Sequence, residues 1–153
     1  MTSFSATVLW NRAPDAAFTD NKYSRAHVWQ FDGGAEVPAS SSPHIVRLPY
    51  SAAENVDPEE AFVASLSSCH MLFFLAGAAK GGFVVDEYRD AASGELGKNE
   101  QGRLFVSKVV LKPQVRYAGA APDRTTEEHL HHEAHEQCFI ANSVRTDISV
   151  DLG

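Results

Sequence analysis

The stretch Asp57–Gly82, DPEEAFVASLSSCHMLFFLAGAAKGG, decides the fold because it is the longest apolar-rich run in the chain. Its start carries helix signals, since Asp57 can cap free amide groups and Pro58 suits the first helical position. Its end carries Lys80 and then two glycines, residues able to take positive φ. Apolar residues recur between them at three- and four-residue steps and later cover almost the full circumference. The stretch therefore predicts a long helix buried inside the protein or inside a dimer.

Length and composition predict a single globular domain over residues 1–153. The chain is 44% apolar and 22% charged, as in ordinary soluble proteins, and its net charge of −7 argues against a non-specific nucleic-acid partner. We expect no signal peptide, because the first residues do not combine a basic start with an apolar core. The most apolar segment, 71–79, is far shorter than the roughly twenty residues that cross a bilayer. We therefore expect a cytoplasmic protein with no membrane partner.

The rest of the chain is rich in strands and contains one more helix. Thr125 or Thr126 can cap this second helix, which we expect to run through residue 142. Because strands come in runs and do not alternate strictly with helices, the order favours an α+β fold with antiparallel sheet. Alternating apolar residues predict strands over these ranges: 3–10, 23–31, 45–48, 83–88, 104–117 and 144–152.

The chain has only two cysteines, Cys69 in the first predicted helix and Cys138 in the second. In a reducing compartment they are buried thiols, a redox pair or metal ligands, because a structural disulfide is not expected there. If the two helices pack face to face, the sulfurs can meet, provided that the Cα atoms approach within about 7 Å. Spacing alone leaves open the alternative that both are small buried hydrophobic residues.

Two motifs surround these cysteines. The segment DPEEAFVASLSSCHM resembles the signature of the OsmC/Ohr family, the osmotically inducible and organic-hydroperoxide-resistance proteins, in which an (N/D)-P-E-x-L/F motif precedes a helical cysteine by ten residues. Glu59 and Cys69 keep that spacing. The segment AHEQCFIANS resembles the A-H-x-x-C-P-x-S segment on the family's second helix. The resemblance covers most of the chain from about Val46 onwards.

The resemblance implies an OsmC-like fold, an intertwined homodimer and a thiol peroxidase. Cys69 would attack an organic hydroperoxide to give an alcohol and a sulfenic acid, and Cys138 would resolve the sulfenic acid to a disulfide. A dithiol reductant, of the lipoyl type or thioredoxin, would then open the disulfide. We expect no cofactor and no metal, because the thiols carry both electrons.

A thiol in an apolar helix tends towards its neutral form, so a cation must stabilise the thiolate. The family uses an arginine oriented by the motif glutamate, which matches Glu59. Two arginines are candidates: we place Arg47 slightly ahead of Arg25, and either can instead be a solvated surface residue. Ten helical residues rise about 15 Å, so Glu59 cannot directly serve Cys69 on its own helix. Either an arginine bridges that distance or a second subunit supplies the glutamate and the arginine, and we expect an obligate homodimer with active sites at its interface.

The sequence departs from the family pattern beside both cysteines. His70 follows Cys69 where a phenylalanine is common, and Phe139 follows Cys138 where a proline is common. His70 projects about 100° around the helix from Cys69, so it either tunes the pocket or packs. The departures favour a divergent subgroup whose substrate differs from the usual bulky hydroperoxide.

Two other functions remain as alternatives. His131, His135 and Cys138 have the i, i+4 and i+7 spacing of metal ligands on one helix face. We favour solvated or packed histidines, because no second ligand pair of standard spacing occurs. The other alternative is a module that binds a small apolar ligand and keeps both thiols inert. The complete histidine cluster before Cys138 consists of His129, His131, His132 and His135.

Overall fold

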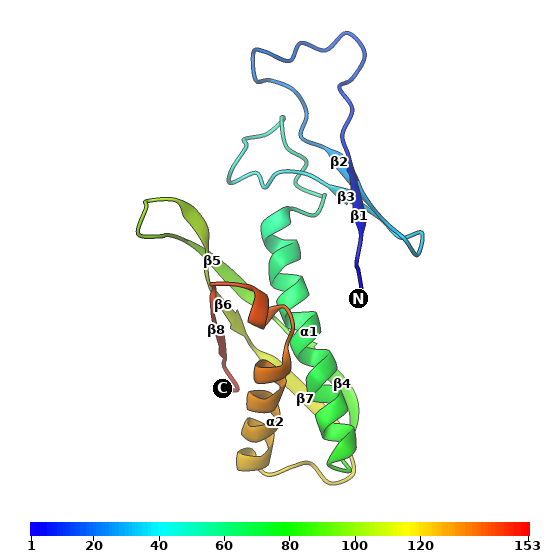
Figure 1. Cartoon of the computed structure of the whole chain (residues 1–153), viewed down its shortest axis with the longest axis vertical. Helices are drawn as coiled ribbons and strands as arrows, with labels where there is room; N and C mark the ends of the chain where they lie inside the picture. The colour runs from blue at the N-terminus through cyan, green and yellow to red at the C-terminus, as the bar shows by residue number, and fades with distance from the viewer. The chain divides into compact units, whose positions relative to one another are not determined.

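The chain divides into two compact units, Met1–Ala61 and Phe62–Gly153. The structure, a computed structural model, describes all residues from Met1 to Gly153. The boundary between the units falls in the first turn of helix α1, Pro58–Lys80. Each unit has its own β-structure (Figure 1). The single domain over 1–153 stays a prediction.

The first unit contains a three-stranded antiparallel sheet in the order β1-β2-β3. Gly34, with φ of 88°, makes the tight turn between β2 and β3 possible. Pro38 lies in the edge strand β3, where a missing N–H group is tolerated. The strands are β1 (Ala6–Leu9), β2 (His27–Phe31) and β3 (Glu36–Ala39).

The predicted strand over 45–48 is wrong. The N–H groups of Ile45 and Val46 both donate to the carbonyl of Ser42, at 3.0 and 2.9 Å. These local bonds form turns, so the backbone groups are not available to a neighbouring strand. The third strand of this sheet is β3, which the sequence pattern did not reveal because Pro38 interrupts it.

One long bent hairpin dominates the second unit. Asp90 pairs with Pro113 and Ser93 pairs with Val110 in the same register, so the paired strands form two continuous arms. The predicted strand 104–117 is broken at Lys112, whose N–H donates to Asp90 Oδ1 at 2.6 Å. The hairpin strands are β4 (Val84–Asp90), β5 (Ser93–Lys98), β6 (Leu104–Leu111) and β7 (Pro113–Ala118).

The last strand, β8 (Asp147–Val150), pairs with β6 in parallel, whereas every other strand pair is antiparallel. Antiparallel sheets and two α-helices confirm the predicted α+β fold class. The structure describes a single chain, so the intertwined homodimer stays a prediction.

Helix α1 begins with a reciprocal capping box. Asp57 Oδ1 accepts from the N–H of Glu60, and Glu60 Oε1 accepts from the N–H of Asp57, each at 2.8 Å. Further along, every fourth residue is buried, which marks the helix face that packs against the rest of its unit. These buried residues are Leu66, His70, Phe74 and Ala78.

Two apolar clusters of the second unit contain this buried face. Leu66 packs with Val109 and other residues of the β5-β6-β8 sheet, and Phe74 packs with Ala134 of α2. Figure 1 shows α2 beside the C-terminal half of α1. A Cβ atom at Gly94 of β5 would lie 2.6 Å from Cγ2 of Val63, so the absence of a side chain lets α1 approach this strand.

By length and composition, α1 is long and apolar enough to cross a membrane. Our estimate of a much shorter apolar segment, 71–79, is therefore wrong, because small residues extend the apolar run over most of the helix. Core helices of soluble proteins meet the same criterion, so a single such helix is weak evidence for a membrane protein.

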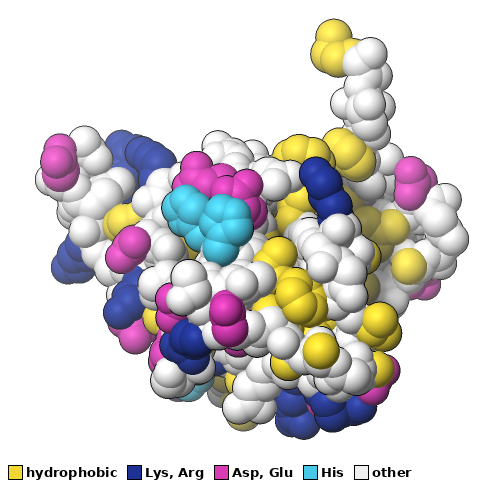
Figure 2. All heavy atoms as spheres, turned by 90° about the horizontal axis from the view of Figure 1, so that it is seen from below, with side chains coloured by type: hydrophobic (Ala, Val, Ile, Leu, Met, Phe, Trp, Pro, Cys, Tyr) yellow, Lys and Arg dark blue, Asp and Glu magenta, His cyan; other side chains and the backbone are white.

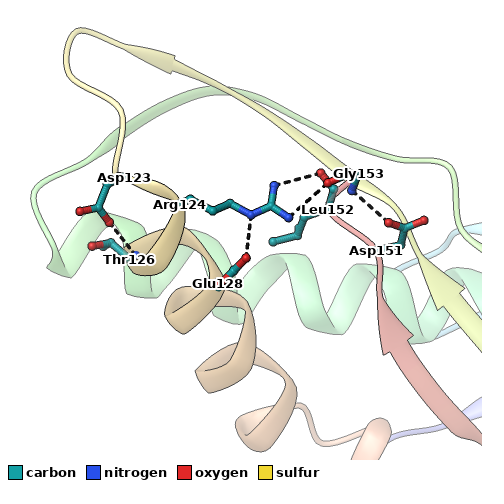
Figure 3. A network of polar contacts seen from close by, with 7 residues as sticks. All are labelled: Asp123, Arg124, Thr126, Glu128, Asp151, Leu152 and Gly153. Atoms are coloured by element: carbon teal, nitrogen blue, oxygen red, sulfur yellow. Dashed lines mark hydrogen bonds and ion pairs between the residues drawn. The ribbon is translucent and has the colours of Figure 1, made fainter.

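Helix α2 (Arg124–Gln137) is tied to the end of β8 (Figure 3). Its cap, Asp123, accepts from the N–H of Thr126 at 2.8 Å. The guanidinium of Arg124 donates to Glu128 at 2.7 Å and to the carbonyls of residues 152 and 153 at 3.3 Å. These contacts fix the start of the helix whose other end carries Cys138.

The predicted extension of α2 through residue 142 is wrong. The helix ends at Gln137, and Cys138 is its C-cap residue in extended conformation. A short 3₁₀ helix, η1 (Ala141–Ser143), follows. Cys138 therefore lies in a turn at the end of the helix, where backbone N–H groups can reach its sulfur.

Candidate functional site

The two thiols meet inside the second unit. Cys69 lies in the middle of α1 and Cys138 caps the end of α2, and their thiols are hydrogen-bonded to each other with no disulfide between them. Cys138 is 1% exposed, whereas Cys69 is partly exposed. The structure thus brings together two residues that are 69 positions apart in the sequence.

The turn after α2 surrounds the Cys138 sulfur. Its Sγ accepts a hydrogen bond from the N–H of Ala141 at 3.4 Å and a further one from the N–H of Ile140. Burial raises the pKa of Cys138, as does the hydrogen bond with Cys69, and the two N–H groups offset this rise in part. Cys138 therefore remains a protonated thiol that can donate to Cys69.

A pair of histidines lies at the same interface between helices. His70 of α1 and His131 of α2 are 1% and 3% exposed, and His70 Nε2 lies 3.0 Å from His131 Nδ1. The two rings are nearly parallel, at an interplanar angle of 5°. Burial is the main cause that lowers the pKa of both imidazoles to about 4. His135 lowers the pKa of His70 further, and His70 lowers that of His131. The pair is therefore neutral at pH 7.

The outer nitrogens of this pair, His70 Nδ1 and His131 Nε2, are buried and have no hydrogen-bond partner. The hydroxyl of Tyr88 is also buried and has no hydrogen-bond partner. Asp90 lies close enough to His70 to raise its pKa in part, and its own Oδ2 accepts from Ser67 at 2.5 Å. Buried, neutral and incompletely bonded groups of this kind are uncommon in protein interiors.

Glu59 and Arg25 line one pocket of the first unit. The pocket has a volume of about 340 Å³. Glu59 Oε2 is buried without a hydrogen-bond partner, which leaves an acceptor for a cation. The residues that line the pocket are Val8, Trp10, Arg25, His27, Ser41, Pro58 and Glu59.

The Arg25 guanidinium is held by its own loop. It lies 3.7 Å from the ring centroid of Tyr23 and donates to the side chain of Asn21 at 2.8 Å. Next to it, His27 Nδ1 is 2.7 Å from the Arg25 carbonyl, while His27 Nε2 accepts from Trp29 at 3.1 Å. Since a carbonyl can only accept, these bonds define a neutral imidazole with its hydrogen on Nδ1.

Arg47 lies elsewhere in the first unit. Its side chain is exposed, and its guanidinium carbon is 5.7 Å from the ring centroid of Tyr50. It does not line the pocket that contains Glu59. Of the two candidate arginines, the structure therefore places Arg25, and not Arg47, in a common pocket with the motif glutamate.

The histidines of α2 do not assemble a metal site. No group of three or more His, Cys, Asp or Glu side chains could hold a metal ion. His131 is bonded to His70, and Cys138 is bonded to Cys69. The i, i+4, i+7 spacing of the sequence thus reflects one packed face of α2.

Sequence reasoning missed part of the pocket in the first unit. His27 is two positions from Arg25, and Trp10 is two positions from Val8, the spacing of side chains on one face of an extended chain. This period of two could have indicated that each pair lines a common pocket. Phe139, identified as a departure from the family, is 71% exposed, and its ring lies edge-on to that of Phe73 at 5.1 Å.

Comparisons with known proteins agree with this architecture. A structure of an OsmC-like protein of unknown function from Vibrio cholerae is 56% identical, with a TM-score of 0.97 and 99% coverage of both chains. An organic hydroperoxide resistance protein from Elizabethkingia anophelis is 17% identical, with a TM-score of 0.71, covering 100% of this chain and 98% of that one.

OhrB of Bacillus subtilis, another organic hydroperoxide resistance protein, is 18% identical, with a TM-score of 0.65 and coverage of 99% and 98%. At these identities, the second and third structures show the shared fold alone. Comparison with curated proteins gives no match. A family model described as OsmC-like protein matches residues 51–153, two thirds of the sequence. The chain therefore belongs to the OsmC-like protein family.

Proposed function

We propose that the chain is a cytoplasmic thiol peroxidase that reduces organic hydroperoxides through Cys69 and Cys138. The observation that carries the proposal is the hydrogen-bonded contact between the two thiols. Family membership supports it, since relatives of the same fold are organic hydroperoxide resistance proteins. A pair of inert buried thiols would not need a fold that brings them together across 69 residues.

The environments of the two sulfurs support different roles. Cys69 is partly exposed, so a peroxide can reach it, whereas Cys138 is buried and its raised pKa keeps it protonated. The Cys69 thiolate attacks a peroxide oxygen, the O–O bond breaks, and the alkoxide takes up a proton and leaves as alcohol. The Cys138 sulfur then attacks the Cys69 sulfenic acid, releases water and forms the disulfide. A dithiol of the lipoyl or thioredoxin type returns two electrons and two protons.

We assign the activating cation to Arg25, with Glu59 as the carboxylate that orients it. Their shared pocket supports this assignment over Arg47, which the resemblance to OsmC-type members favours slightly. The partnerless Oε2 of Glu59 can accept from a guanidinium once substrate or a second subunit reorganises the Arg25 loop. Both arginines are far from Cys69 in sequence, so spacing alone could not choose between them.

We further propose that the active form is a homodimer. Ten residues of helix separate Glu59 from Cys69, a rise of about 15 Å, so either an arginine bridges that distance or another subunit supplies the carboxylate and cation; we propose the second. Exposed apolar residues of the second unit support association: Leu72 is 61% and Val84 is 58% exposed. Figure 2 shows hydrophobic side chains gathered at the surface of one face. A hollow of about 400 Å³ lies between the end of α1 and the start of β4.

The proposal is tested by steady-state reduction of cumene hydroperoxide with a dihydrolipoyl reductant. Cys69→Ser should abolish turnover, whereas Cys138→Ser should consume one equivalent of peroxide and accumulate a sulfenic acid that dimedone traps. Equal residual turnover in both variants contradicts the roles. Stoichiometric apolar ligand binding with unreacted thiols in the wild type would support the binding-module alternative.

Matched arginine variants test the choice of cation. Arg25→Lys should lower kcat/KM for the peroxide by about a hundredfold or more, because a lysine cannot reproduce the bidentate geometry of a guanidinium. Arg47→Lys, the control, should leave kcat/KM near the wild-type value. The opposite ranking would return the assignment to Arg47.

A further inference from the structure

The histidine pair between α1 and α2 is not used by the proposed chemistry. His70 Nε2 and His131 Nδ1 are 3.0 Å apart and join the two helices by a side-chain hydrogen bond, separate from the contact of Cys69 with Cys138 at the end of α2. The pair must therefore be explained by what it does to the helices.

The histidine pair carries a desolvation cost that apolar side chains in the same space would not carry. A neutral imidazole has one N–H donor and one acceptor, so a single bond between two of them leaves one buried donor and one buried acceptor unpaired, whichever tautomers form. The partnerless His70 Nδ1 and His131 Nε2 are those two atoms. Two leucines of similar volume would pack here without this desolvation cost. A purely space-filling role therefore does not account for the pair.

The other contacts between α1 and α2 do not by themselves specify the position of α2 along α1. They are apolar: Phe74 and Ala78 pack with Ala134, and Leu130 lies 3.4 Å from the position of a Cβ atom on Gly77. Small side chains form shallow ridges, and apolar contacts have no preferred direction. Apolar packing of this kind does not by itself specify one pair of atoms that must meet.

A hydrogen bond with a defined N···N distance supplies the missing constraint. His70 adjoins Cys69 on α1, and His131 lies on α2 seven residues before Cys138, the C-cap residue at the end of that helix. Any slip of α2 along α1 that stretches the histidine bond also separates the sulfurs. His131 is itself held by Phe74, whose ring is stacked 4.2 Å away.

We propose that the His70–His131 hydrogen bond is a positioning device that sets the register of α2 on α1 and thereby holds the Cys69 and Cys138 sulfurs within bonding distance. This inference rests on the proposed redox role of the two thiols. The two imidazoles are hydrogen-bonded to each other, and they act through the helices that carry the cysteines.

The test measures the equilibrium between dithiol and disulfide against dithiothreitol, with the disulfide formed by diamide so that no peroxide is needed. In His70→Leu/His131→Leu, the equilibrium constant for closing the disulfide should fall about tenfold or more, while the thermal midpoint of the reduced protein stays equal or rises. A merely structural role would not separate these two readouts.

A second double variant, His70→Gln/His131→Asn, places amide groups near the former Nε2 and Nδ1 positions and can restore one bond between the helices. It should recover the disulfide equilibrium to within about threefold of the wild type. If the leucine variant does not fold, His70→Gln/His131→Leu, which has no partner for the amide, takes its place in the comparison.

An unchanged equilibrium in the folded leucine variant, or no recovery in the amide variant, would overturn the inference. Neither result bears on peroxide chemistry, because diamide forms the disulfide. Conversely, a wild-type protein that closes this disulfide but does not react with hydroperoxide would refute the proposed function and leave the positioning role intact.

Discussion

Acidification should destabilise the protein through the buried His70–His131 pair. Burial lowers the pKa of each imidazole from 6.5 to about 4, so between these values the unfolded chain binds more protons than the folded one. Stability is therefore complete above pH 6.5 and decreases as the pH falls towards 4. His135 lowers the pKa of His70 further, and Asp90 raises it in part.

The size of the effect follows from these pKa values. Moving a pKa from 6.5 to about 4 corresponds to about 3 kcal/mol of unfolding free energy per histidine. With two such residues, the slope approaches about 2.7 kcal/mol per pH unit in the middle of the window. Between pH 6 and pH 5 we expect a loss of about 2 kcal/mol from the pair.

Urea denaturation followed by circular dichroism at closely spaced pH values measures this loss. The reference is His70→Leu/His131→Leu, which keeps the five other histidines and every carboxylate. Protein concentration is held constant, because association of subunits would also change the apparent stability. The free energy of unfolding of the wild type should decrease relative to that of the variant as the pH falls from 6.5 to 5. Parallel curves between pH 6.5 and pH 5 would refute the reasoning.

Three other perturbations have defined outcomes. Gly94→Ala should lower the unfolding free energy by about 1–3 kcal/mol, because its Cβ would lie 2.6 Å from Val63 Cγ2, and Val63→Ala should relieve the loss; an undiminished urea midpoint in the single variant contradicts this packing. When a monothiol opens the diamide-formed disulfide, it should attack and remain bound to Cys69, because Cys138 is buried. An adduct on Cys138 in peptide mass spectrometry would show that the monothiol attacks the other sulfur and would contradict this prediction. Leu72→Gln should weaken the proposed dimer in sedimentation equilibrium, since this side chain is 61% exposed in the single chain; unchanged association places the interface elsewhere.

The sequence predicted the long helix well because its signals are local. Asp57 caps the free N–H of Glu60, as predicted, and the helix ends at Lys80, before the two glycines. The second helix was predicted too long, since no glycine or proline marks its end at Gln137. There the chain turns so that backbone N–H groups meet the Cys138 sulfur, which is a contact made after the helix has ended.

Other features depend on contacts between distant residues, which a single sequence does not display. The apolar run 45–48 predicts a strand, but local turns satisfy its backbone. His70 stands out in the sequence as a departure from the family pattern, and His131 stands out as part of the histidine cluster. Their hydrogen bond joins residues 61 positions apart, which neither pattern indicates. The same holds for Arg25, whose place in the Glu59 pocket follows from how its loop folds.

The most direct test of the peroxidase proposal is the fate of the two thiols after one equivalent of cumene hydroperoxide. We expect both thiols to be lost, one cumyl alcohol to form per chain, and the mass to fall by two hydrogen atoms through a Cys69–Cys138 disulfide. Two thiols that remain titratable after exposure to the peroxide would contradict the account.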